Sequence, residues 1–294
     1  MSLAIGQGIG SPFVLKAAAS LPLQSLSASA AYSLRRTRLG YTGALVRVRR
    51  SSDNLEADIG YTAFGDLDTV ALLAHTGANS GFVVTWYDQS GNARHATQST
   101  AGVQPRIVDA GAVEIKNGRP AVRAHINTSM LPLFKFAAPS TAWSFNYVAS
   151  RDNTGSNNNN VIGMDGAGFN ANGIYTQITD TGTTTIFNRV GAIDIVSGGT
   201  VSIAAGQTLV SSVTHTVGNV AQQHTNGVAG TASAPLTWVD GALLNFRLGE
   251  YTAAPTLSLL GTYQEFISFA SALTVAERRA LERNQGAYFG VVVA

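Results

Sequence analysis

Short runs of β-branched and aromatic residues, separated by Gly, Asn, Asp and Pro, recur along most of this 294-residue chain. The clearest is "ALVRVRR" at 44–50, whose alternation places Val46 and Val48 on one strand face and Arg47 and Arg49 on the other. Many short strands with regular turn signals predict an antiparallel β-sandwich. The other predicted strands are 82–88, 143–150, 173–179, 208–215, 243–249 and 261–269.

Helical patterns are few. "LTVAERRALERNQG" at 273–286 is the clearest, because Thr274 and Glu277 form a T-x-x-E capping box and Gly286 supplies a predicted stop. Two further segments are predicted as helices, 25–38 and, on a weaker pattern, 66–77.

One hairpin is specified by its turn. Asn226-Gly227 separates two β-prone runs, and this dipeptide suits the left-handed backbone of a type I′ turn. The polar segment 150–160 is predicted to be a loop rather than a domain linker.

Composition narrows the functional classes. The chain has no cysteine, which excludes disulfides, thiolate zinc sites and a cysteine nucleophile, and fits folding in a reducing cytosol. Charged residues make up only 12% of the chain and the net charge is +2, so no nucleic-acid partner is expected. No dense acidic loop indicates calcium, and we expect no metal and no cofactor.

The first residues are expected to be an arm. Residues 1–24 are apolar but lack a basic start, contain Gly and Pro, and carry Lys16 inside the apolar stretch, so they do not form a secretory signal. We expect 1–24 to dock on a neighbouring subunit and 25–294 to form the sandwich domain. No segment is apolar for long enough to suggest membrane insertion.

Two segments resemble a known family. "AAYSLRRTRLGYTGALVRVRRSSDN" at 30–54 and "TWYDQSGNARHATQ" at 85–98 resemble the start of the α-L-arabinofuranosidase B catalytic domain. The resemblance implies an all-β, concanavalin A-like (jelly-roll) antiparallel sandwich with a few short helices. The module also resembles one found in bacteriophage structural proteins. The C-terminal part, with "HTNGVAG" and "YQEFISFASALTVAERRALERNQGAYFG", resembles the broader group of lectin-like sandwiches.

The chain departs from the arabinofuranosidases in several ways. Those enzymes are secreted, disulfide-bonded and carry a separate arabinose-binding trefoil domain, whereas this sequence has no cysteine and no predicted signal, and it leaves no room for a trefoil after residue 294. Their catalytic carboxylate motifs have no counterpart that we can place here, so the resemblance transfers no catalytic residue.

Glycoside hydrolysis requires two carboxylates on either side of one sugar. Glu265, among aromatic residues on a predicted central strand, and Asp240 are the weak catalytic candidates. A structural pairing of Glu265 with an arginine is favoured over catalysis. Six arginines form the main charge cluster, and intramolecular ion pairing with the acidic residues that follow is favoured over phosphate binding: Arg35, Arg36, Arg38, Arg47, Arg49 and Arg50.

The 85–98 segment supplies the candidate ligand-binding residues, namely Trp86, Tyr87, Asp88, Gln89 and His95. Asp88 stands two residues before Ser-Gly, where a carboxylate readily accepts backbone hydrogen bonds, so pinning a turn is favoured over ligand contact. Adjacent Trp86 and Tyr87 point to opposite faces of a strand, which leaves one for the core and one for a sugar or a subunit. No nucleophile accompanies His95, so a hydrogen-bonded loop histidine is favoured over a base.

Three functions remain open at this stage. The first is a bacteriophage virion component, in a tail, fibre or capsid-decorating position, assembled in the host cytoplasm as a homo-oligomer with other virion subunits and binding host-surface carbohydrate. The second is an arabinofuranosidase-like glycoside hydrolase. The third is a structural subunit without a ligand.

Overall fold

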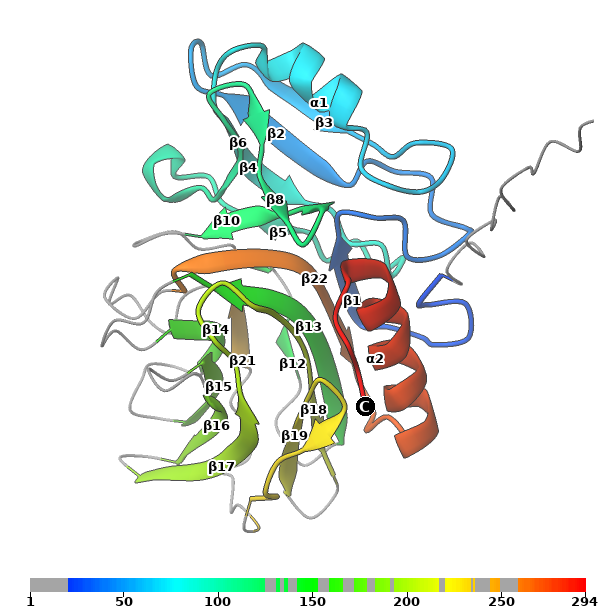
Figure 1. The fold of residues 1–294 in the computed structure, drawn as a ribbon, viewed down its shortest axis with the longest axis vertical. Helices are drawn as coiled ribbons and strands as arrows, with labels where there is room; N and C mark the ends of the chain where they lie inside the picture. Colours follow the sequence, from blue (N-terminus) through cyan, green and yellow to red (C-terminus); the bar gives the residue numbers. More distant parts are fainter. Residues whose placement is uncertain are drawn as a thin grey trace, which may run out of the picture.

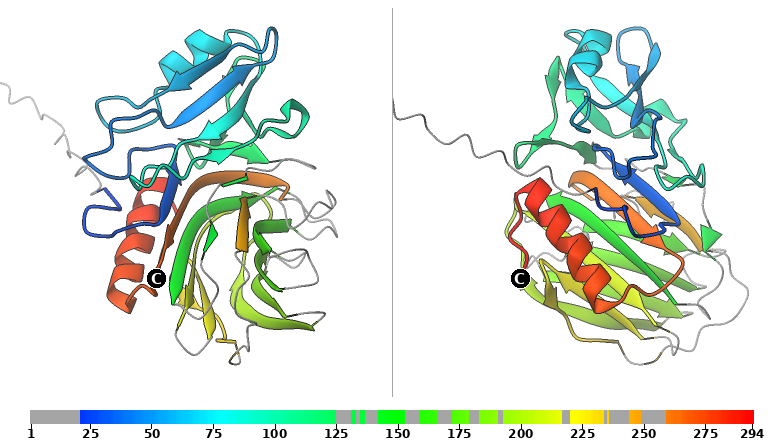
Figure 2. Two further views of the ribbon diagram at one scale, coloured as in Figure 1. Left: turned by 180° about the vertical axis from the view of Figure 1, so that it is seen from behind. Right: turned by 90° about the vertical axis from the view of Figure 1, so that its right-hand side faces the viewer.

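The computed structural model describes residues 21–124, 131–132, 135–136, 142–152, 159–165, 172–178, 183–190, 193–216, 220–233, 235, 244–248 and 259–294. In these residues the chain forms two antiparallel sheets that face each other, and helix α2 (Val275–Phe289) covers the outer face of the larger sheet (Figures 1 and 2). The predicted sandwich is therefore confirmed. Part of the larger sheet continues past the sandwich and carries helix α1 (Thr69–Thr76) (Figure 1).

The larger sheet has fourteen strands among the described residues, many of them short. They are β1 (Ala30–Ser33), β2 (Val46–Arg50), β3 (Glu56–Ile59), β4 (Gly81–Trp86), β5 (Ala96–Thr97), β6 (Arg106–Asp109), β7 (Ala112–Val113), β10 (Val122–Ala124), β11 (Leu131–Pro132), β13 (Trp143–Arg151), β18 (Thr208–His215), β19 (Ala221–Thr225), β20 (Val228–Ala229) and β22 (Gly261–Phe269).

The smaller sheet comprises six strands in the described part of the chain, and it faces β13, β18 and β19 (Figure 1). They are β12 (Lys135–Phe136), β14 (Asn159–Asp165), β15 (Asn172–Ile178), β16 (Thr183–Val190), β17 (Ile193–Ser202) and β21 (Leu244–Leu248). Outside both sheets, β8 (Ile115–Lys116) pairs with β9 (Arg119–Pro120), and Ala101–Val103 forms a 3-10 turn.

The central strand β13 is buried along its whole length because both of its faces are covered. Phe145 and Tyr147 point into the main apolar core, where Phe145 packs against Phe266 of β22. The alternate residues point toward α2, and the hydroxyl of Ser144 accepts a hydrogen bond from the backbone N–H of Leu273 at 2.8 Å. The sequence of β13 still alternates, because Trp143, Phe145 and Tyr147 face the apolar core, whereas Ser144 and Asn146 form hydrogen bonds on the face that α2 covers.

Helix α2 confirms the predicted capping box. The Glu277 N–H donates to the Thr274 hydroxyl at 3.3 Å, and the Glu277 carboxylate accepts from the Thr274 N–H at 2.8 Å. The predicted stop at Gly286 is wrong, because the helix continues to Phe289 and ends at Gly290 in the left-handed region. Gly286 serves a different purpose: a Cβ there would lie 2.6 Å from the carbonyl oxygen of Val291, so the returning chain needs a glycine at this point.

The predicted helix at 25–38 is wrong. Residues Ala30–Ser33 form β1, which pairs antiparallel with β22 and is buried throughout. Its composition favours a helix by local propensity, but pairing with a core strand buries all four side chains, and tertiary packing overrides propensity. The weaker prediction at 66–77 is confirmed by α1, which Asp68 caps by accepting from the Ala71 N–H at 2.9 Å.

Two further local predictions are confirmed. Val46 and Val48 of β2 are buried while Arg47 and Arg49 are only partly buried, as the alternation requires. Asn226 and Gly227 have φ values of 50° and 84° and join β19 to β20, as a type I′ turn requires. Most of the predicted loop at 150–160 lies outside the described residues.

The described end of the predicted arm packs on the domain itself. Leu23 is buried against Ala31, Ile267 and Leu281, between β1, β22 and α2. Residues 1–20 lie outside the described part. Of the helices in the described residues, none has the length and apolar composition that crossing a bilayer requires.

Candidate functional site around residues 85–98

The 85–98 segment leaves β4 and folds into a loop that is held by the carboxylate of Asp88. This carboxylate accepts hydrogen bonds from the backbone N–H groups of Ala31, Ser90 and Arg94 at 2.8 to 2.9 Å, and from the Ser90 hydroxyl at 2.7 Å. Asp88 is buried, with 3% of its surface exposed. Its oxygens are therefore saturated by donors of the protein, and the bond to Ala31 ties the loop to β1.

Gln89 makes a second tie to the same segment. Its side-chain oxygen accepts from the N–H and the hydroxyl of Thr37 at 2.8 and 3.0 Å. Its amide nitrogen donates to the carbonyl oxygens of Ser33 and Arg35, both at 3.0 Å. Gln89 is fully buried, so the residue connects two backbone segments and presents no surface to a ligand.

Trp86 and Tyr87 separate as the strand geometry predicts. Trp86 lies fully in the core beside Tyr32, whereas Tyr87 is half-buried and donates its hydroxyl to Asp58 at 2.7 Å. Burial, together with this hydrogen bond, raises the pKa of Tyr87 to about 12. Tyr87 is therefore a neutral hydrogen-bond donor at physiological pH.

His95 packs edge-on against Tyr87, with ring centroids 5.0 Å apart. Its Nδ1 accepts from the backbone N–H of Asp88 at 3.1 Å, which places the proton of the neutral ring on Nε2. The imidazole thus connects the two ends of the loop by bonding to Asp88, as predicted for a hydrogen-bonded loop histidine.

Glu265 lies across β1 from this loop, in the centre of β22. Arg35 donates to its two oxygens at 2.8 and 3.1 Å, and Ser33 and Gln285 donate at 2.7 and 3.1 Å. Glu265 is fully buried. Gln89 and Glu265 therefore bind the same short segment, residues 33–35, because Ser33 and Arg35 each form hydrogen bonds with both of them. Asp240, the other weak catalytic candidate, lies outside the described residues.

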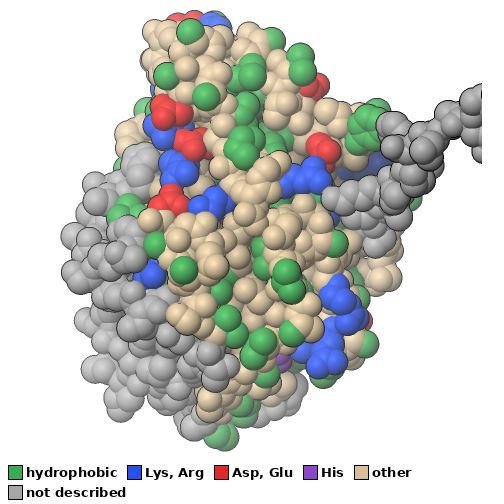
Figure 3. All heavy atoms as spheres, in the orientation of Figure 1, with side chains coloured by type: hydrophobic (Ala, Val, Ile, Leu, Met, Phe, Trp, Pro, Cys, Tyr) green, Lys and Arg blue, Asp and Glu red, His purple; other side chains and the backbone are tan. Residues whose placement is uncertain are grey.

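The arginine cluster is largely paired within the molecule. Arg47 pairs with Asp58 at 2.8 Å and Arg50 with Asp53 at 2.5 Å, whereas Arg35 pairs with the distant Glu265. Arg49 donates to Gln104 and Asn54 side-chain oxygens. On the face in Figure 3, several basic side chains lie beside acidic ones on a mostly neutral surface.

A network of ion pairs around β6 and β10 was not foreseen from the sequence. Glu114 lies between Arg106 and Arg123, and Arg123 also reaches Asp152, which pairs with Lys116. Glu114 lies 8 residues from Arg106 and 9 from Arg123, and Asp152 lies 29 residues from Arg123. These separations match no local sequence pattern.

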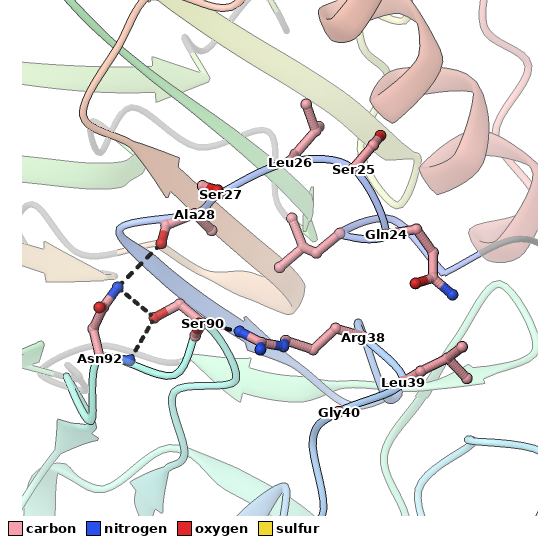
Figure 4. A pocket seen from close by; sticks show the side chains of 11 residues that line it. Gln24, Ser25, Leu26, Ser27, Ala28, Arg38, Leu39, Gly40, Ser90 and Asn92 are labelled. Carbon is pink, nitrogen blue, oxygen red and sulfur yellow. Dashed lines mark hydrogen bonds between the residues drawn. The ribbon is translucent and has the colours of Figure 1, made fainter.

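The outward residues of the loop face a different environment. Ser90 and Asn92 line a pocket together with Arg38 and the segment 23–28 (Figure 4). Sequence reasoning placed Arg38 only in the basic cluster and did not single out Asn92. Among the described residues, no three metal-ligating side chains converge on one point.

Residues 24–130 match the family model "Alpha-L-arabinofuranosidase B, catalytic", which confirms the family resemblance of this segment. A GH54 α-L-arabinofuranosidase soaked with a cyclic sulfate inhibitor aligns with a TM-score of 0.64 and 17% identity, over 87% of this chain and 62% of its own. An arabinofuranosidase complexed with arabinofuranosyl-α-1,2-xylobiose aligns with a TM-score of 0.64 and 19% identity, over 91% of this chain and 64% of its own.

A Trypanosoma rangeli sialidase is more distant, with a TM-score of 0.51 and 12% identity over 69% of this chain and 31% of its own. At these identities the likenesses show the fold, a concanavalin-like sandwich of the arabinofuranosidase type. The chain spans less than two thirds of the length of the arabinofuranosidase structures. No curated protein matches it.

Proposed function

We propose that this chain is a glycoside hydrolase of the arabinofuranosidase type, acting on α-L-arabinofuranosyl side chains. The observation that carries the proposal is the family-model match over residues 24–130, which includes the loop held by Asp88 and Gln89. The alignment of most of the chain with arabinofuranosidase structures supports it.

The chemistry requires a proton donor and an ionised carboxylate about 5 Å apart for retention, or ~6.5–9.5 Å apart for inversion. Nearly every acidic side chain that the structure describes already has a protein partner, with the exposed Glu56 as the exception. We therefore place the catalytic pair among the acidic residues whose side chains lie outside the described part: Asp165, Asp180, Asp194, Asp240 and Glu250.

The test is a set of single Asp→Asn and Glu→Gln variants at those five positions, assayed with 4-nitrophenyl α-L-arabinofuranoside. Two of the variants should lose turnover by about a thousandfold or more while keeping the unfolding midpoint of the parent, because each removes a group that acts in the transition state. Asp109→Asn is the matched control, since it alters only an exposed ion pair with Arg106. Absence of turnover in the parent, or full activity in all five variants, would refute the proposal.

A second candidate is a non-catalytic, lectin-like virion component that binds host-surface carbohydrate and assembles with other subunits. It is favoured because the described carboxylates mostly form ion pairs and hydrogen bonds within the protein. It predicts glycan binding without turnover, and a homo-oligomer or a particle that contains the chain in electron micrographs. Turnover that depends on a carboxylate pair would count against it.

A further inference from the structure

A pocket of about 540 Å³ lies between the outward side of the 85–98 loop and the segment that precedes β1 (Figure 4). Its volume is in the range of small-molecule sites, and polar groups predominate in its lining. The lining residues are Leu23, Gln24, Ser25, Leu26, Ser27, Ala28, Arg38, Leu39, Gly40, Ser90 and Asn92.

Arg38 is the charged group of this pocket, and at least three of its five N–H donors are unused within the described residues. Its Nη1 donates to the carbonyl oxygen of Ser90, which holds the guanidinium in place (Figure 4). Within the described residues, Nε and Nη2 have no hydrogen-bond partner. These two atoms form one edge of the guanidinium, the edge that matches the two oxygens of a carboxylate.

Gly40 keeps that edge open. A Cβ at position 40 would lie 3.7 Å from Nη2 and 4.0 Å from Nε of Arg38, so a larger side chain here would cover both donors. Gly40 does not have a positive φ, and the backbone therefore accepts other residues. Glycine at position 40 therefore leaves space beside the guanidinium of Arg38, and it is not required by the local backbone conformation.

The remaining lining suits a ligand with hydroxyl groups. Gln24 and Asn92 contribute amides, and neither the Gln24 side chain nor Oδ1 of Asn92 has a partner in the described structure. Ser25 and Ser27 add hydroxyls, and Leu39, 62% exposed, offers an apolar surface for the C–H face of a ring.

The charges around the pocket favour an anion. No acidic residue lines it. Asp88, the carboxylate of the 85–98 loop, is buried and accepts four hydrogen bonds, and Arg94, the arginine of that loop, donates to the carbonyl oxygen of Ser29. Arg38 is therefore the charge that a ligand in the pocket would meet.

We propose that this pocket is a binding subsite for an acidic sugar, a uronic acid whose carboxylate pairs with the Nε/Nη2 edge of Arg38 and whose hydroxyls bond to the surrounding amides and serines. The subsite is separate from the proposed hydrolysis and requires only binding, so its test involves no turnover.

The test is calorimetric titration of the whole protein with methyl β-D-glucuronide, with methyl β-D-glucoside as the uncharged counterpart and acetate as the anion without a ring. The glucuronide should bind at least tenfold more tightly than either, because only it uses both the carboxylate and the hydroxyl contacts. Arg38→Gln should weaken glucuronide binding at least tenfold.

Gly40→Leu provides the second variant, because it covers the donor edge while leaving the Arg38–Ser90 bond in place. It should also abolish glucuronide binding, even if Arg38→Gln fails to fold. Arg47→Gln is the matched control, since it removes an exposed arginine outside the pocket, and it should bind like the parent. No binding of the glucuronide, equal binding of glucoside or acetate, or unchanged binding in Gly40→Leu would each overturn the proposal.

Discussion

Arg35 and Glu265 form a buried, two-pronged ion pair between residues 230 positions apart, with 4% and 0% of their side chains exposed. The guanidinium also lies over the Tyr288 ring, 4.3 Å from its centroid. Arg35 thereby joins the segment that follows β1 to β22 and to the end of α2. The geometry explains why an acidic residue occupies the centre of a core strand: it anchors an arginine.

Glu265→Gln should destabilise the fold by about 3–5 kcal/mol, because the neutral amide leaves the buried Arg35 charge uncompensated. Urea unfolding followed by circular dichroism measures the loss. Arg47→Gln breaks the exposed pair with Asp58 and should cost only about 0.2–1 kcal/mol. A Glu265→Gln protein as stable as the parent would contradict the anchoring role.

Asp88→Asn should cost about 2–4 kcal/mol, because the amide replaces an acceptor oxygen with a donor and leaves buried N–H groups unpaired. Hydrogen exchange measured by mass spectrometry should show faster exchange at Ala31 and Arg94, whose N–H groups bond to Asp88. Unchanged protection at both amides would show that the carboxylate does not hold the loop.

Gly286→Ala should destabilise the protein by about 1–3 kcal/mol, although alanine is the better helix former by ~1 kcal/mol. The added methyl group would lie 2.6 Å from the Val291 carbonyl oxygen and from a Val293 methyl group. Gly60→Ala is the control, since a Cβ there meets nothing within 4 Å. Thermal unfolding compares the two, and a Gly286→Ala midpoint at or above that of the parent would rule out the steric explanation.

His224 should make the fold sensitive to acid. Burial, together with the nearby Arg278 and Arg279, lowers the pKa of its imidazole from 6.5 to about 4. The unfolded chain therefore binds a proton below pH 6.5 that the folded chain refuses until about pH 4, so stability falls across this interval as pH decreases.

His224→Gln removes that group. Between pH 7 and pH 4, the free energy of unfolding falls in both proteins, and the fall should be about 1–2 kcal/mol smaller in the variant than in the parent. Denaturant titrations at the two pH values measure the difference. Parallel pH profiles would place the His224 pKa at its ordinary value.

Much of the fold follows from local patterns. The β-branched runs, the capping box at Thr274 and Glu277, and the turn at Asn226-Gly227 each act over a few residues, where steric preferences and short hydrogen bonds decide the conformation. In the candidate site, the same reasoning anticipated that Asp88 pins a turn and that Trp86 and Tyr87 face opposite sides.

The sequence by itself determined the strand-rich architecture, the last helix and the family resemblance of the first third of the chain. Only the tertiary structure decided that 30–33 is a strand, that Glu265 pairs with Arg35, and that Arg38 lines a pocket beside Asn92. The physical reason is that these outcomes depend on partners tens to hundreds of residues away, whose burial and charge pairing outweigh the small energies of local propensity.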